Sequence, residues 1–327
     1  AWEGVRGSTP ESAGFDESCM KGGNTYWNAK IEINGETQNI AQPYYGSDIC
    51  CDYAVDFVRR NADTPFFLYY AFNLPHWDFD ATPDSEDINS RKDDSNFPDM
   101  VTYTDKLVGR VVKQLDELGL RENTLILFSG DNGTASRIIS PFKGAMRKGG
   151  KGSRRMIDAN VPLIANWPGK IEAGRVCNDL VDFTDIYPTL AHVCGQLEEE
   201  SGLDGQSFLP QLFAKPSTPR RWVVSYFKGR DRGLNKNSGF FWIGDQQWKL
   251  DHTGKLYHLA TDPQEAKPIR RSEDNRESAQ VRREFEAALA TLDIDCRNLW
   301  VYVGTGGKPR TRANAKVKLY GKAKWSE

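Results

Sequence analysis

Four side chains in this 327-residue sequence have the chemistry to hold a metal ion and a charged substrate. Asp131 and Asn132 place a carboxylate and an amide oxygen side by side, and Ca²⁺ or Mg²⁺ prefers such hard oxygen ligands. His76 is an imidazole that can transfer a proton near neutral pH, and Lys151 carries an ammonium group. Two oxygen ligands are too few for a metal site, so further carboxylates must come from elsewhere.

Each of these residues also has a simpler interpretation. An isolated Asp-Asn-Gly is more often a turn than a metal site, and an isolated histidine such as His76 is more often hydrogen-bonded in a structural role. The glycine-rich residues 148–152 would let backbone and ammonium groups approach an anion, but they lack the strand-to-helix pattern of a nucleotide loop. Lys143 and Lys148 are nearby cations, and solvated surface lysines are the favoured interpretation of both.

Buried strands are expected to position these residues. Residues 65–72 and 124–129 are continuous apolar runs, typical of strands buried on both faces of a parallel sheet, and residues 161–167 form a third. His76 follows the first run and Asp131 the second. Ligands of parallel α/β sheets bind beyond the carboxyl ends of the strands, so both residues stand where a site is expected.

Helical patterns alternate with these strands. Apolar periodicity predicts helices over residues 47–61, 101–118 and 180–193, and Gly119 is placed to end the second. The alternation predicts an α/β fold with a largely parallel central sheet. Residues 1–45 show no clear period and are expected to be irregular.

The chain changes character near residues 215–219. Short strand-like runs follow, and then a helical pattern with apolar residues from Val281 to Leu292, which together predict a small antiparallel sheet covered by a helix. The expected division is a catalytic domain at 1–215, a subdomain at 216–293 and a basic tail at 294–327.

Composition excludes several classes of protein. The formal net charge of −2 argues against binding nucleic acid through bulk electrostatics, and no apolar run is long enough to cross a bilayer. The six cysteines form no CxxC pair and no zinc cluster, so they are interpreted as small buried hydrophobes with one disulfide at most.

The order of these motifs resembles the sulfatase family, of the alkaline-phosphatase-like superfamily. The resemblance runs from about residue 10 to 293. It includes the strand at 65–69 with the histidine loop at 73–76, the strand and metal motif at 122–133, and Lys151 with the strand at 161–164. Residues 179–190, 203–205, 248–250 and 255–263 continue it.

The resemblance implies roles for the four residues. Asp131 and Asn132 would be metal ligands, most often to Ca²⁺, with Mg²⁺ as the other candidate. His76 and Lys151 would contact the sulfate group and its bridging oxygen, and steady the charge on the leaving group. The substrate would be a sulfated small molecule or glycan, and export to the periplasm, extracellular space or lysosome is a family expectation.

The family nucleophile has no counterpart in the sequence. Family members convert the Cys or Ser of a C/S-x-P-S-R motif into formylglycine, and none of the six cysteines here fits it. Residues 217–221 match its spacing only superficially, and they follow the metal motif instead of preceding it. The paired N-terminal aspartates and the Gly-Lys-Trp segment are also absent, and residues 154–160 replace a glycine-containing stretch.

We therefore expect a sulfatase fragment or subunit that is inactive alone and that an N-terminal sulfatase fragment could complete. A phosphonate or phosphate monoester hydrolase of the same superfamily is one alternative. A non-catalytic, sulfatase-like binding module is another, although the intact His76, Asp131, Asn132 and Lys151 argue against it.

Overall fold

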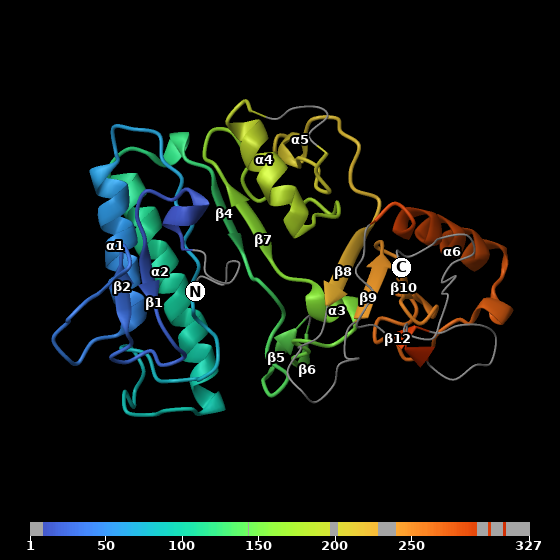
Figure 1. Cartoon of the computed structure of the whole chain (residues 1–327), viewed down its shortest axis with the longest axis horizontal. Coiled ribbons are helices and arrows are strands. Elements are labelled where there is room, and N and C mark those ends of the chain that lie inside the picture. The colour runs from blue at the N-terminus through green and yellow to red at the C-terminus, as the bar shows by residue number, and fades with distance from the viewer. Residues whose placement is uncertain are drawn as a thin grey trace. The chain divides into compact units, whose positions relative to one another are not determined.

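The computed structural model divides the chain into two units. Unit 1 comprises residues 1–126 and 166–170, and unit 2 comprises residues 127–165 and 171–327. The structure describes residues 9–142, 144–196, 202–227, 240–292, 300–301 and 310–311. Lys143 and most of the predicted basic tail lie outside the described residues, and the division predicted at residues 215 and 293 stays a prediction. Figure 1 labels the elements.

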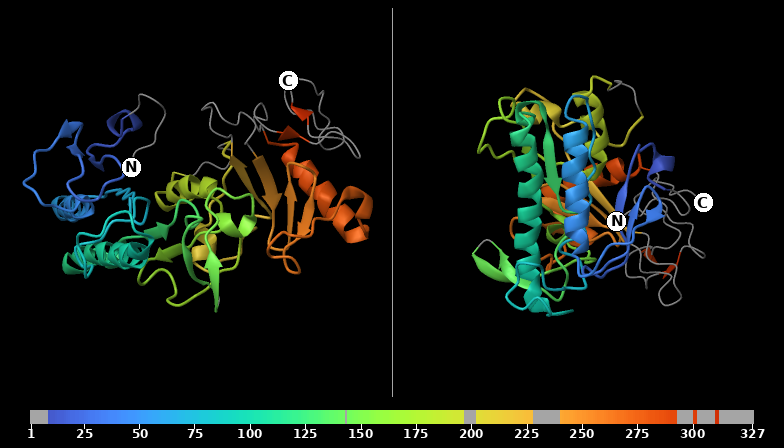
Figure 2. Two further views of the ribbon diagram at one scale, coloured as in Figure 1. Left: turned by 90° about the horizontal axis from the view of Figure 1, so that it is seen from below. Right: turned by 90° about the vertical axis from the view of Figure 1, so that its left-hand side faces the viewer.

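Two long helices form the body of unit 1. Helix α1 (Gly46–Arg60) and helix α2 (Phe97–Glu117) lie side by side, as Figures 1 and 2 show. Both bury residues three or four apart, which is the spacing of one helix face; the buried apolar residues are Cys51, Ala54, Val58, Met100, Tyr103, Leu107 and Leu115. Both helices were predicted and are confirmed.

The ends of α2 follow the local sequence. The helix begins four residues earlier than predicted, with Pro98 in its first turn, where a missing N–H costs nothing. Gly119, two residues after its last residue, has a φ of +69°, which confirms the predicted glycine stop.

A small antiparallel sheet occupies part of the segment that was expected to be irregular. Strands β1 (Cys19–Lys21), β2 (Ile31–Ile33) and β3 (Glu36–Thr37) pair in that order. The strands are only two or three residues long, too short to show an alternating pattern in the sequence.

Residues 65–72 belong to no strand within the described residues, so the predicted buried strand is wrong in this structure. Side chains alternate along the segment: Phe66 and Leu68 are half-buried, whereas Phe67 and Tyr69 are 58% and 64% exposed. A strand needs a partner for its backbone groups, and no described strand pairs with this one.

The other two predicted strands pair with each other. Strands β4 (Ile126–Ser129) and β7 (Leu163–Asn166) form a two-stranded sheet. The Trp167 indole N–H donates to the Glu122 carbonyl (2.9 Å), and the Ser129 hydroxyl donates to the Pro162 carbonyl (2.9 Å). Because the start of one strand meets the end of the other, the pair runs antiparallel, and a largely parallel central sheet is not confirmed.

Between β4 and β7 the chain forms a hairpin and a short helix. Strands β5 (Ile139–Phe142) and β6 (Ala145–Lys148) pair antiparallel, and helix α3 spans Met156–Ala159. Helix α4 (Ile186–Val193) begins later than predicted, because a 3₁₀ turn at Phe183–Asp185 precedes it, and helix α5 spans Leu209–Leu212.

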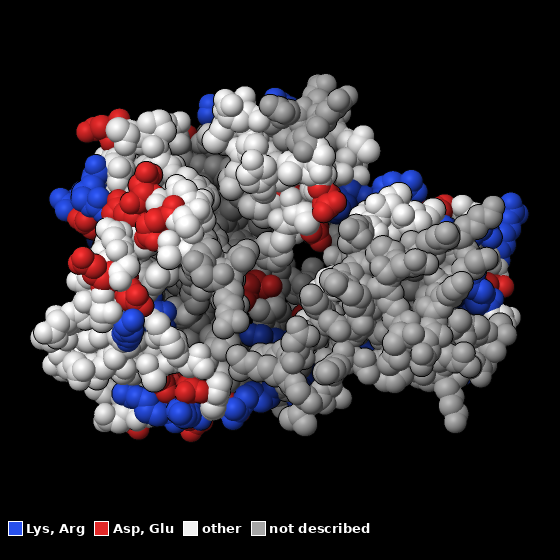
Figure 3. Space-filling model, in the orientation of Figure 1, with Lys and Arg blue, Asp and Glu red and all other residues white. Residues whose placement is uncertain are grey.

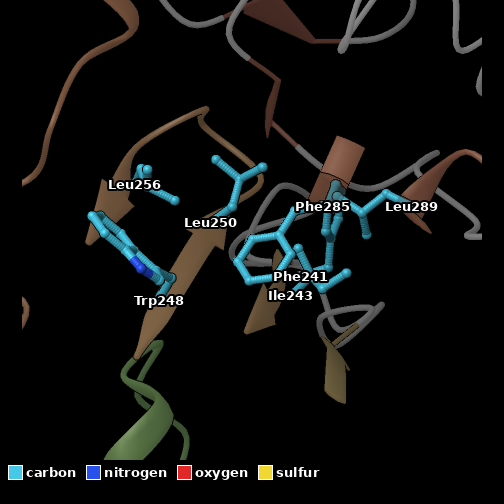
Figure 4. Close-up of a cluster of buried hydrophobic side chains, with 7 residues drawn as sticks. All are labelled: Phe241, Ile243, Trp248, Leu250, Leu256, Phe285 and Leu289. Carbon is cyan, nitrogen blue, oxygen red and sulfur yellow. The ribbon is translucent and has the colours of Figure 1, made fainter. Parts of the chain in front are cut away.

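The predicted C-terminal antiparallel sheet and its helix are confirmed. The sheet has the order β11-β10-β9-β8, with strands β8 (Val223–Phe227), β9 (Phe240–Gly244), β10 (Trp248–Asp251) and β11 (Leu256–His258). Helix α6 (Arg276–Leu289) covers it. Figure 4 shows Phe241 and Ile243 of β9 gathered with Phe285 of α6 in a buried cluster. Strands β12 (Trp300–Val301) and β13 (Arg310–Thr311) form a separate antiparallel pair.

The surface carries both signs of charge. On the face of unit 1 seen in Figure 3, acidic and basic side chains are interspersed, in keeping with the formal net charge of −2. Among the helices of the described residues, none combines the length and the apolar character that a membrane span requires.

Candidate active site

The loop after β4 presents the two predicted metal ligands to solvent. We call residues 130–134 the aspartate loop. Asp131 and Asn132 are both exposed, and the loop is anchored at its start by the hydrogen bond from Ser129 to the Pro162 carbonyl. The carboxylate and amide oxygens are therefore accessible to an ion.

Lys151 lies on a second loop that is bonded directly to the first. We call residues 148–152 the lysine loop. The Lys151 backbone N–H donates to the Thr134 carbonyl (2.9 Å), and the Gly149 N–H donates to the Ile138 carbonyl (2.8 Å). The structure thus brings the aspartate loop and the lysine loop together, with the Lys151 side chain exposed.

Asp158 is the group that both loops pack against. Its side chain is 3% exposed and accepts three hydrogen bonds, from Arg147 Nη2 (2.6 Å), Ser153 Oγ (2.5 Å) and Arg155 Nε (2.7 Å). A carboxylate buried with two guanidinium groups is fully paired, so it can be held in one position without the cost of an isolated charge.

Two glycines make this packing possible. A Cβ atom on Gly150 would overlap the Asp158 carboxyl group, and one on Gly133 would overlap the Asp158 carbonyl oxygen. Gly133 directly follows Asn132, and Gly150 directly precedes Lys151. Asp158 therefore fixes the backbone next to both sets of candidate residues.

Contacts with the C-terminal sheet fix the segment that follows the lysine loop. Lys249 and Glu265 form an ion pair whose side chains are 1% and 4% exposed. Lys249 Nζ also donates to the Arg154 carbonyl, and Glu265 Oε1 accepts from the Met156 N–H (2.6 Å). Burial lowers the pKa of Lys249, and the contact with Glu265 opposes that shift. The segment after the lysine loop is thereby tied to β10.

His76 is placed by contacts within unit 1. The backbone N–H of His76 donates to the Asn73 carbonyl (2.9 Å). The Tyr26 hydroxyl donates to the backbone carbonyls of Asn73 (2.7 Å) and His76 (2.9 Å). Its imidazole is exposed. Asp131, Asn132 and Lys151 belong to unit 2, so the grouping of His76 with them stays a prediction.

The superficial nucleophile motif at residues 217–221 has a structural role. Arg220 forms a buried ion pair with Asp185, and its Nε donates to Asp185 Oδ2 (2.9 Å). Asp185 also accepts from the Gln206 N–H (2.8 Å) and the Asp182 N–H (2.8 Å). The guanidinium serves to anchor the chain between α4 and β8.

The described residues hold no cluster of three or more His, Cys, Asp or Glu side chains that could bind a metal. Asp131 and Asn132 fit Ca²⁺ or Mg²⁺ in chemistry, because both supply hard oxygens, but they provide only part of a coordination shell.

Sequence reasoning missed Asp158, Arg147 and Arg155. The only signal was the departure at residues 154–160 from the family pattern, and a lone aspartate within it gave no indication of burial. Lys249 lay in a recognised motif, but nothing in its neighbours predicted an ion pair.

Two family models match the chain. The model described as Sulfatase matches residues 4–196, and the model described as N-sulphoglucosamine sulphohydrolase, C-terminal, matches residues 153–295. Together they span the described parts of both units up to the end of α6.

Among curated proteins, the uncharacterized sulfatase YdeN of Escherichia coli is 31% identical over 66% of this chain and 40% of that protein. The N-acetylgalactosamine-6-sulfatase of Canis lupus familiaris is 27% identical over 76% of this chain and 51% of that protein. The chain thus spans about half the length, or less, of these relatives.

Solved structures show the same fold. Ps i-CgsB in complex with k-i-k-neocarrahexaose has a TM-score of 0.68 and 26% identity, covering 88% of this chain and 68% of that one. BT4656 in complex with its substrate D-glucosamine-2-N,6-O-disulfate has a TM-score of 0.65 at 18% identity, covering 87% of this chain and 76% of that one.

Proposed function

Because the chain belongs to the sulfatase family, we propose that the protein hydrolyses sulfate esters. The observation that carries this proposal is the direct bond between the two loops: the Lys151 N–H donates to the Thr134 carbonyl, two residues beyond Asn132. A sulfate ester needs cationic groups around its oxygens and a proton source for the departing alkoxide. The lysine loop offers one cation, and the bonded aspartate loop offers oxygen ligands that would hold a second, a metal ion.

Each candidate residue has a role in the proposal. Asp131 and Asn132 would hold Ca²⁺, which when bound neutralises charge on the sulfate oxygens. The exposed ammonium of Lys151 would stabilise the negative charge that grows on the bridging oxygen. His76 would supply the proton to the leaving group, which requires that its exposed imidazole reach the substrate.

The formylglycine nucleophile belongs to the proposal as well. No Cys or Ser of the printed sequence begins the full C/S-x-P-S-R motif, so the nucleophile would be contributed by residues outside these 327. An N-terminal sulfatase fragment that carries it would also cover apolar side chains. Phe67 and Tyr69 of unit 1 are exposed, and so is Ile164 of unit 2.

A sulfated glycan is the proposed substrate class. The support is that two structures of the same fold were solved with carbohydrate ligands, a neocarrahexaose and a disulfated glucosamine. An aryl sulfate serves as a general probe of the same bond.

The test compares the rates at which an aryl sulfate and the matching aryl phosphonate are hydrolysed. The protein is expressed from its complete reading frame and assayed with Ca²⁺ present. Faster hydrolysis of the sulfate ester supports the proposal. Faster hydrolysis of the phosphonate supports the related phosphonate hydrolase instead, and hydrolysis of neither supports a non-catalytic module.

A further inference from the structure

A basic cavity of about 390 Å³ lies beside the lysine loop. It is lined by Met146, Arg147, Lys148, Gly149, Arg155 and Gln264. The first three lining residues come from β6, and Arg155 directly precedes α3, so all of them belong to unit 2.

Two of its guanidinium groups are held in fixed orientations. Arg147 and Arg155 each donate to the buried carboxylate of Asp158, and Arg155 Nη1 also donates to Gln264 Oε1 (2.9 Å). Both guanidiniums keep further N–H groups, since each carries five. Donors that are already fixed lose little conformational entropy when an anion binds.

The cavity has an excess of positive charge. Among the residues that the structure describes, Asp158 is the one acidic side chain paired with Arg147 and Arg155, and Lys148 adds a third cation. Lys148 is exposed, and its ammonium forms no ion pair or hydrogen bond with the described part of the chain. The amide oxygen of Gln264 already accepts from Arg155, which leaves its NH₂ group to donate.

One wall of the cavity is apolar. Met146 is 66% exposed, and its flexible thioether side chain suits contact with the ring of a sugar. The combination of fixed N–H donors, an exposed ammonium and an apolar flank is the chemistry that recognises an acidic carbohydrate.

We propose that this cavity binds a second sulfate group of the substrate, distinct from the one that is hydrolysed. The inference rests on the proposed function, because it takes the substrate to be a sulfated glycan. The lysine loop connects the two places: Lys148 lines the cavity and Lys151, three residues later, stands at the candidate active site. The protein would therefore prefer glycans that carry more than one sulfate.

The test measures binding by calorimetry with two probes, D-glucosamine-2-N,6-O-disulfate and D-glucosamine-6-O-sulfate. The variants are Lys148→Ala and Gln264→Ala, with Lys255→Ala as the control, because Lys255 is also exposed in unit 2 but does not line the cavity. None of these changes removes a partner of the buried Asp158.

The unaltered protein should bind the disulfate about tenfold more tightly than the monosulfate, because a hydrogen bond to a charged group contributes that much. Lys148→Ala should remove most of the preference, Gln264→Ala part of it, and Lys255→Ala none. Equal affinity for the two sugars, or a preference that survives Lys148→Ala, would overturn the inference.

The result is separable from the proposed function. Hydrolysis of an aryl sulfate without any preference between the two sugars would contradict the second-sulfate site alone. A preference that depends on Lys148 in a protein without sulfatase activity would contradict the proposed reaction alone.

Discussion

The carboxyl group of Asp158 lies directly against Gly150, so closely that a Cβ atom at position 150 would overlap it. Since Lys151 is the next residue, this contact sets the position of the lysine loop. Gly133, next to Asn132, meets the backbone of the same aspartate. One buried residue thus organises the two loops that carry three of the four candidate side chains.

Gly150→Ala should destabilise the protein by about 1–3 kcal/mol, because the new methyl group displaces a buried, paired carboxylate. Gly109→Ala is the matched control: a Cβ there meets nothing within 4 Å and the residue lies inside α2, so a gain of up to about 1 kcal/mol is expected. Urea unfolding measures both. A Gly150→Ala protein as stable as the unaltered one would show that the contact is not rigid.

Removal of one partner of the buried pair Lys249–Glu265 should cost about 3–5 kcal/mol of unfolding free energy, because the remaining charge stays buried and unpaired. Glu265→Leu and Lys249→Met should each show this loss, and the double variant should recover much of it. A double-variant cycle by chemical unfolding checks the coupling. Additive losses would mean that the pair does not act as a unit.

The unfolding free energy is expected to depend on pH because His252 is buried. Burial is the main cause that lowers its pKa from 6.5 to about 4 in the folded chain. Between these values the unfolded chain binds more protons, so stability falls as the pH drops from about 6.5 towards 4, by about 3 kcal/mol in total.

The measurement is unfolding free energy against pH for His252→Phe, with His192→Gln as the control because His192 is exposed. His252→Phe should show a shallower loss of stability across this range, and His192→Gln should follow the unaltered protein. Identical slopes for all three proteins would contradict the assignment to His252.

Asp131 should contribute to binding of Ca²⁺. Asp131→Ala removes a carboxylate ligand and should weaken Ca²⁺ binding at least tenfold, as measured by calorimetry on protein expressed from its complete reading frame. Asp116→Ala serves as the control, since its carboxylate lies at the exposed end of α2, paired with Arg121. Equal Ca²⁺ affinity in Asp131→Ala would remove this residue from the metal site.

The sequence was sufficient to predict the helices and strands whose pattern depends only on residues close to one another in the chain. Apolar periodicity located α1, α2 and α6, short strand-like runs located the strands of the C-terminal sheet, and Gly119 marked a helix end. It failed at residues 65–72, where an apolar run indicated burial but the described structure has no partner strand. It also could not reveal that β4 and β7 run antiparallel, since strand direction depends on contacts between distant residues.

The candidate site also contains residues that the sequence identified and residues that it did not. Asp131, Asn132 and Lys151 were identified by residue type and family spacing, and the two loops that carry them are bonded to each other. Asp158 and the pair Lys249–Glu265 were not found, because burial of a charge depends on three-dimensional packing. The position of His76 relative to the other three is a prediction of the family resemblance.

The most direct test of the account is the rate of sulfate release from an aryl sulfate by protein expressed from its complete reading frame, compared between Lys151→Ala and Lys255→Ala. If the ammonium of Lys151 stabilises the leaving group, Lys151→Ala should lower kcat by about 100-fold or more, whereas Lys255→Ala should leave it unchanged. Equal kcat values for the unaltered protein and Lys151→Ala would contradict the account.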